Sequence, residues 1–203
     1  MIPKTISHRL QRTGLSFSAP RRVLRIAFAI GLCAAGATAT PARAHQHGRE
    51  PGSSPLVEKV RLATARFVNI NNAMNDGWIQ ATPCVSGPSD GAMGVHFLKP
   101  DRLHDGVLKG DEPEMLIYEP VANGKFRLVG VEYIVLANEW SAKNEPGAAP
   151  SVDGHLANFV AEPNRYALPA FYELHVWAWA DNPNGSFADW NSKVSCDRQR
   201  VSR

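Results

Sequence analysis

The residues of this sequence whose types best suit chemistry are histidines and glutamates that fall inside predicted β-strands. Apolar and polar residues alternate around them, and successive residues of a strand point to opposite faces of a sheet. This alternation places His96, Glu132 and His175 on one face, here called the second face. Imidazole nitrogen and carboxylate oxygen suit a divalent transition metal (Zn, Cu, Fe or Mn), with positions left open for water or substrate. The pattern therefore predicts a metal site on the second face.

Three further residues are candidates for a fourth ligand or for outer partners that orient the ligands: Glu119, Glu173 and His155. The alternative is a half-exposed sheet whose acidic residues face solvent and whose histidines make ordinary hydrogen bonds. The sequence contains no short-spacing motif such as His-Glu-x-x-His. Both interpretations therefore stay open at this point.

A second group of chemical interest is aromatic. The same alternation places Trp177 and Trp179 on the second face, beneath a long loop. Aromatic side chains in such a place line pockets for small ligands, or simply pack the loop against the sheet. This predicts an alternative function, a non-catalytic periplasmic protein that binds a small ligand or a protein partner.

The first 44 residues have the features of a cleavable signal peptide. Basic residues without any acidic residue precede and flank an apolar run over 23–35, and the segment ends in Ala42-Arg43-Ala44. The run is shorter than the roughly 18 apolar residues that a membrane span needs. We therefore expect an exported protein, periplasmic or extracellular, with no stable membrane span after cleavage. The pair Arg21-Arg22 leaves the general and the twin-arginine export routes open.

Cleavage after residue 44 changes both the new N-terminus and the net charge. The mature chain then begins with His45-Gln46-His47, which can chelate Cu(II) or Ni(II), the alternative being a polar leader without metal. The signal holds seven of the 22 Lys and Arg and none of the 19 Asp and Glu, which leaves 15 basic against 19 acidic residues, or −4 instead of +3. The basic charge that favours nucleic acid is confined to the signal, so no nucleic-acid partner is expected.

The cysteines also divide at the cleavage site. Cys33 lies in the signal, and Cys84 and Cys196 remain as an even pair. In an oxidising compartment an even pair favours a disulfide, the alternative being two free thiols.

The elements expected to position these residues form one α+β domain over 55–197, between a flexible leader (45–54) and a frayed tail (198–203). Ser54 as N-cap and Pro55 begin a helix whose apolar stripe runs to Gly77. Asn123-Gly124 is a hairpin signal. The predicted fold is one long amphipathic helix packed on a mostly antiparallel four-stranded sheet, with a long loop (137–169) over the other face. The strands are expected at 94–98, 114–119, 126–136 and 171–179.

Several stretches of the chain resemble a family of uncharacterised exported bacterial proteins. They are Gly94-Val-His-Phe, Leu116-Ile-Tyr-Glu-Pro, Leu128-Val-Gly-Val-Glu-Tyr and Tyr172-Glu-Leu-His-Val-Trp-Ala-Trp, and the resemblance spans roughly 60–196. It implies a single exported domain. It implies no established activity and no catalytic residue.

Overall fold

The computed structural model of the protein describes residues 54–199. The predicted signal peptide, nearly all of the leader and the histidine pair His45 and His47 lie outside the described residues. Within 54–199, no helix combines the length and the apolar character that crossing a bilayer requires.

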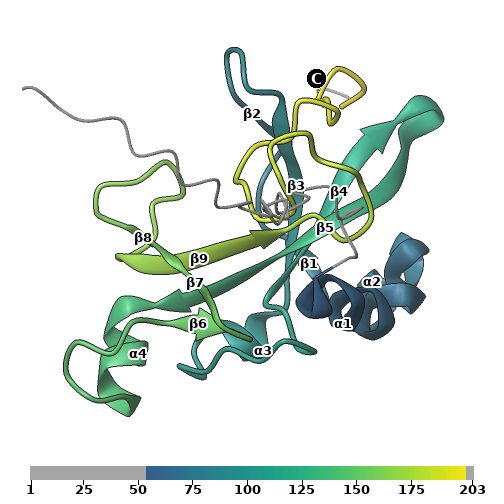
Figure 1. The fold of residues 1–203 in the computed structure, drawn as a ribbon. Coiled ribbons are helices and arrows are strands. Elements are labelled where there is room, and N and C mark those ends of the chain that lie inside the picture. The colour runs from purple at the N-terminus through teal and green to yellow at the C-terminus, as the bar shows by residue number, and fades with distance from the viewer. Residues whose placement is uncertain (1–53, 200–203) are drawn as a thin grey trace, which may run out of the picture. The chain divides into compact units, whose positions relative to one another are not determined.

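An antiparallel sheet of seven strands forms the centre of the domain (Figure 1). Its four longer strands are the four that the sequence predicts, and three strands of two or three residues extend it at the edges. The order is β1-β3-β4-β5-β9-β8, with β2 also paired to β3. The strands are β1 (Ile79–Gln80), β2 (Val85–Ser86), β3 (Ala92–Leu98), β4 (Met115–Val121), β5 (Lys125–Leu136), β8 (Asn158–Val160) and β9 (Phe171–Val176).

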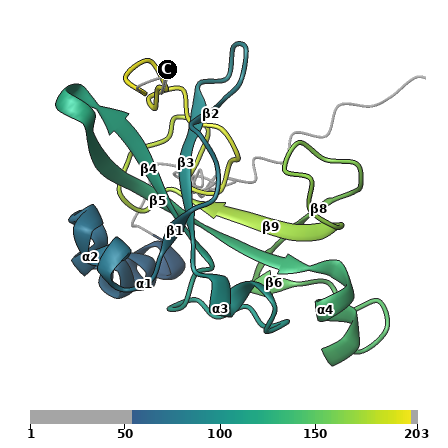
Figure 2. The same ribbon diagram turned by 180° about the vertical axis from the view of Figure 1, so that it is seen from behind.

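The predicted fold class, one long helix on a four-stranded sheet, is wrong. The helical segment is divided into α1 (Pro55–Thr64), the 3-10 turn η1 (Ala65–Val68) and α2 (Ile70–Asn75), which Figure 2 shows as short helices side by side. The division occurs at Asn69, whose backbone is extended and whose side chain accepts the N–H of Asn71. Asparagine favours this capping position over a helix interior because its side chain competes for backbone hydrogen bonds.

The predicted long loop over 137–169 is also wrong, because much of it is ordered into short elements. It contains α4 (Ala137–Lys143), a separate two-stranded sheet of β6 (Ser151–Val152) and β7 (His155–Leu156), and the edge strand β8. Strands this short show no readable alternation, which explains why the sequence did not reveal them. The remaining short helices are α3 (Pro100–Leu103) and η2 (Ala122–Gly124).

The hairpin between β4 and β5 turns through η2, at the predicted asparagine and glycine, with Val121 paired to Lys125. Leu116 pairs with Val131, and an irregularity beside Ile117 places Tyr118 opposite Leu128. A shift of one residue reverses the faces to which the side chains of a strand point. Leu128 therefore packs on the side of α1, and Val129 packs on the second face.

Strand β5 is buried on both sides of the sheet. Every residue from Leu128 to Leu136 is buried. One side packs against α1 and α2, where Val60 is fully buried with Val131 and Tyr133. The other side lies under the segments that precede and follow β9. Any polar side chain that β5 directs to the second face is consequently enclosed.

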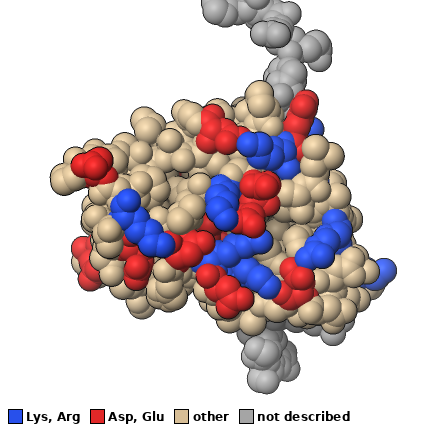
Figure 3. All heavy atoms as spheres, turned by 90° about the horizontal axis from the view of Figure 1, so that it is seen from below, with Lys and Arg blue, Asp and Glu red and all other residues tan. Residues whose placement is uncertain are grey.

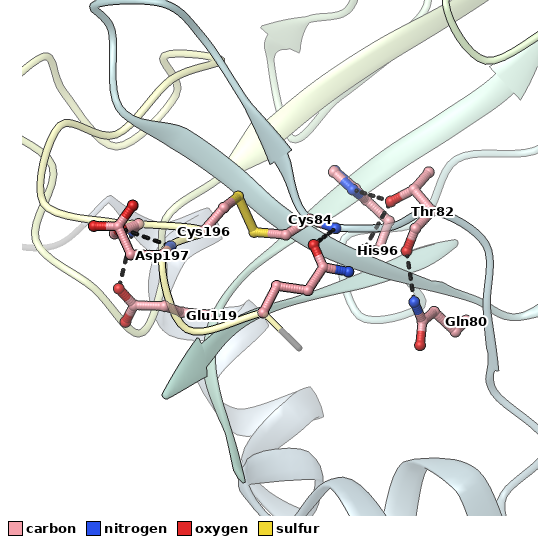
Figure 4. Close-up of a disulfide and its surroundings, with 9 residues drawn as sticks. Gln80, Thr82, Cys84, His96, Glu119, Cys196 and Asp197 are labelled. Carbon is pink, nitrogen blue, oxygen red and sulfur yellow. Dashed lines mark hydrogen bonds between the residues drawn. A yellow bond between two sulfur atoms is a disulfide. The ribbon is translucent and has the colours of Figure 1, made fainter. Parts of the chain in front are cut away.

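Cys84 and Cys196 lie at disulfide-bonding distance, with an S–S separation of 2.07 Å and a sequence separation of 112 (Figure 4). The bond joins the segment before β3 to the C-terminal segment. The N–H of Cys84 also donates to the side chain of Gln199, 2.8 Å away. The C-terminal segment is thus attached to the edge of the sheet at β2 and β3.

Replacing both cysteines with serine is expected to lower the free energy of unfolding. For a closed loop of this length the chain-entropy model gives up to about 4 to 5 kcal/mol. Urea denaturation followed by circular dichroism measures the change, and wild-type protein unfolded in reductant serves as the matched control. Equal midpoints for oxidised and reduced wild type would contradict a stabilising disulfide.

Candidate metal centre

Three strands bring together the three residues that alternation placed on the second face. His96 comes from β3, Glu132 from β5 and His175 from β9, and Glu132 pairs directly with His175 across the two strands. A ligand atom from each lies within 4.8 Å of the other two. Ligands with metal bonds near 2.1 Å at tetrahedral angles are about 3.4 Å apart. Small side-chain movements therefore suffice for all three to bind one ion.

The environment of the two histidines keeps both imidazoles neutral. Each is 1% exposed. Burial lowers the pKa of His96 to about 4, and burial together with the neighbouring His96 lowers the pKa of His175 to about 3. Neutral imidazole is the form that binds metals. Both side chains are thus in the ligating form at neutral pH.

The carboxyl groups on the second face are buried together. Glu132 is 4% and Glu173 is 6% exposed. Burial raises the pKa of Glu132 well above its usual range, and the charge of Glu173 raises it further. Burial likewise raises the pKa of Glu173. Buried carboxylates of this kind need a cation as partner, and a metal ion provides one.

The cluster also contains buried atoms without hydrogen bonds. Within residues 54–199, the buried side-chain nitrogen and oxygen atoms that lack a partner are Nε2 of His96, both ring nitrogens of His175 and Oε2 of Glu173. The nearest polar group to His96 Nε2 is Oε2 of Glu132, at 3.3 Å but outside hydrogen-bond geometry. Leaving a buried polar group unpaired costs about 1 to 3 kcal/mol. Their concentration in one cluster points to a missing common partner.

The ring of His96 is held in place by Thr82. The hydroxyl oxygen of Thr82 lies 3.0 Å from Nδ1 of His96 and also accepts a hydrogen bond from the backbone N–H of His96. Thr82 is two residues from Cys84, so the disulfide fixes the segment that orients this imidazole (Figure 4). Hydrogen bonding at one ring nitrogen sets which nitrogen is free for a metal. Here it leaves Nε2, the atom that faces Glu132.

A residue that sequence analysis missed lies next to His175. Asp189, in the C-terminal segment, places Oδ1 3.8 Å from Nδ1 of His175. Together with Glu173 these residues form a second group of potential ligands. Asp189 lies in a stretch rich in Asn, Gly and Asp without periodicity, so no local signal could have assigned it. At 3.8 Å this contact is too long for a hydrogen bond, and both ring nitrogens of His175 stay unpaired.

Two of the additional candidates lie away from the cluster. Glu119 accepts hydrogen bonds from the guanidinium of Arg127 and from the N–H of Ser195. His155 stacks on Phe187 with ring centroids 3.9 Å apart. Both side chains have other partners, whereas Glu173 is the one additional candidate that the structure places beside the ligands.

The two tryptophans do not form an aromatic face together. Trp177 is 2% exposed and packs on the second face, with its indole N–H donated to the carbonyl of Ala188. Trp179 packs with the cluster around α1 and donates its N–H to the hydroxyl of Thr64. Its predicted placement on the second face is therefore corrected. The regular alternation ends with β9 at Val176, before this residue.

The charged side chains of the domain are mixed. The face in Figure 3 shows Lys and Arg side by side with Asp and Glu. Several of them form pairs, among them Lys59 with Asp153 and Lys109 with Glu112.

Comparisons with known proteins give no match. No family model, no curated protein and no solved structure is similar to this chain. The candidate site therefore depends on its own geometry and chemistry.

In metal-free protein, His175→Leu is expected to leave the free energy of unfolding unchanged or to raise it by up to about 1 kcal/mol, because it removes buried nitrogens that have no hydrogen bonds. Chemical denaturation in the presence of a chelator measures this. His96→Leu is the matched control and is expected to lower the free energy of unfolding by about 1 kcal/mol, since it removes the hydrogen bond between the imidazole and the hydroxyl of Thr82. A loss of more than about 2 kcal/mol in His175→Leu would show that its nitrogens are satisfied.

Proposed function

We propose that this protein is an exported metal-binding protein that holds one divalent transition-metal ion between His96, Glu132 and His175. The observation that carries the proposal is the set of unpaired buried atoms, which all belong to one cluster around these residues. Two imidazoles and one carboxylate form a ligand set found in catalytic zinc and iron sites.

The charge of the cluster also favours a cation. Three carboxyl groups, those of Glu132, Glu173 and Asp189, surround two neutral imidazoles. A divalent ion bound by Glu132 favours the ionised form of these carboxyl groups and supplies the missing partner of both histidines. Glu173 then lies beside the ion as an outer carboxylate, and Asp189 orients His175.

An ion held by these three residues has at least one coordination position open for water or a ligand. Three protein ligands with an open fourth position are the arrangement of catalytic zinc sites, whereas structural sites are closed by four. An ion bound in this way polarises an oxygen that coordinates it.

Export is part of the same proposal. The signal-like segment over 1–44 and the paired cysteines support it. Disulfides persist in oxidising compartments, where the pair Cys84 and Cys196 remains bonded.

Purified mature protein is expected to bind one Zn²⁺ per chain, and His175→Ala and Glu132→Gln are each expected to weaken binding more than about 100-fold. This exceeds the 10- to 100-fold effect of losing an outer partner, which we expect for Thr82→Val. Competition with a chromophoric chelator measures the affinity, in a His45→Ala/His47→Ala background that removes chelation by the N-terminus.

His155→Ala is the matched control, because this histidine lies outside the cluster and stacks on Phe187. It is expected to leave zinc affinity unchanged. Equal affinities for wild type and His175→Ala, or the absence of stoichiometric zinc, would overturn the proposed function.

A further inference from the structure

A cavity of about 370 Å³ opens beside the candidate metal centre. Its volume is in the lower part of the roughly 300 to 1,000 Å³ range of small-molecule pockets. The walls come from β3, β4, β5, β9, the segment over 81–85 and the segment between β8 and β9, which contributes Tyr166 and Leu168. The side chains that face it from the sheet include Met115, Ile134 and Phe171.

The walls of this cavity are apolar, and most of their polar groups are already bonded. The hydroxyl of Tyr166 lies 3.4 Å from the sulfur of Met93, and that of Thr82 is bonded to His96. The guanidinium of Arg165 lies over the ring of Trp190, 5.4 Å from its centroid. Apart from the guanidinium of Arg165, a ligand in the cavity therefore finds few groups along the walls that are free to form hydrogen bonds.

The polar end of the cavity coincides with the metal ligands. His96 and Glu132 both line it, and both belong to the ligand cluster. Nε2 of His96 is one of the buried nitrogens without a hydrogen bond. A molecule that enters the cavity thus reaches the same point in space at which the ion is proposed to bind.

We propose that this cavity binds a small carboxylate with an apolar body, whose carboxylate oxygen occupies the open position of the metal ion and whose body contacts Ile134, Leu168 and Phe171. This inference rests on the proposed function. The apolar walls favour a ligand with an apolar body, and the ion favours a ligand with a carboxylate group. An engineered cavity of about 150 Å³ holds benzene, so this one accommodates a body of roughly ten non-hydrogen atoms.

The test uses hydrocinnamate as probe and hydrocinnamyl alcohol as its neutral analogue, with calorimetry on the zinc-loaded mature protein. One hydrocinnamate is expected to bind per chain of zinc-loaded protein, at least about tenfold more tightly than the alcohol does. Its affinity for the zinc-loaded protein is also expected to be at least about tenfold higher than its affinity for protein from which a chelator has removed the zinc. That tenfold ratio corresponds to about 1.4 kcal/mol. Zinc affinity is measured on the same samples.

Leu168→Trp fills the cavity from its outer wall and is expected to abolish hydrocinnamate binding. Leu156→Trp is the matched control, because Leu156 is 66% exposed and does not line the cavity. It is expected to bind the probe as wild type does. Thermal unfolding of both variants establishes that each is folded.

The outcomes separate the two proposals. Zinc binding without hydrocinnamate binding, or with equal binding by Leu168→Trp, overturns the inference and leaves the metal site standing. Probe binding that persists without zinc and disappears in Arg165→Ala also overturns it, because the carboxylate then pairs with the guanidinium. Failure to bind zinc overturns the proposed function and this inference with it.

Discussion

The enclosure of β5 on both faces is the constraint on which the rest of the structure depends. Because its residues from Leu128 to Leu136 are all buried, the side chain of Glu132 is almost entirely enclosed, with 4% of its surface exposed. The cover of the second face is built from several distant segments, and the bond between Cys84 and Cys196 holds two of them together. A carboxyl group enclosed in this way is stable only when it is protonated or when it is paired with a cation. The buried histidines from the flanking strands, His96 and His175, place ligand atoms within 4.8 Å of this carboxyl group and of each other.

The same enclosure connects stability with function. Polar atoms without partners are retained in a core at a cost of about 1 to 3 kcal/mol each. A metal ion that binds the folded chain and not the unfolded one repays that cost through its binding free energy. Thr82 is bonded to Nδ1 of His96, which leaves Nε2 of that ring without a partner, and both ring nitrogens of His175 also lack hydrogen bonds. The apolar cavity reaches His96 and Glu132, two of the residues proposed to hold the ion.

Alternation along strands predicted the candidate ligands because its period of two depends only on neighbouring residues. A wrong prediction for another element of the fold does not change it. The irregularity beside Ile117 exchanges the faces of Leu128 and Val129 but lies on the hairpin side of Val131, so the face of Glu132 is unaffected. The helical prediction failed because the break at Asn69 depends on capping, and a continuous apolar stripe does not reveal it. Asp189 and the cavity wall at Leu168 arise from tertiary packing of aperiodic segments, which no local pattern encodes. Only the chain's folding brings them to the second face.

The most direct test of the central claim is zinc-edge X-ray absorption on stoichiometrically loaded protein with His45 and His47 replaced by alanine. The account predicts only nitrogen and oxygen neighbours at about 2.0 to 2.2 Å, with outer-shell scattering from two imidazoles in wild type and from one in His175→Ala. A shell of oxygen neighbours alone, or identical imidazole scattering in wild type and His175→Ala, would contradict a metal centre on the second face.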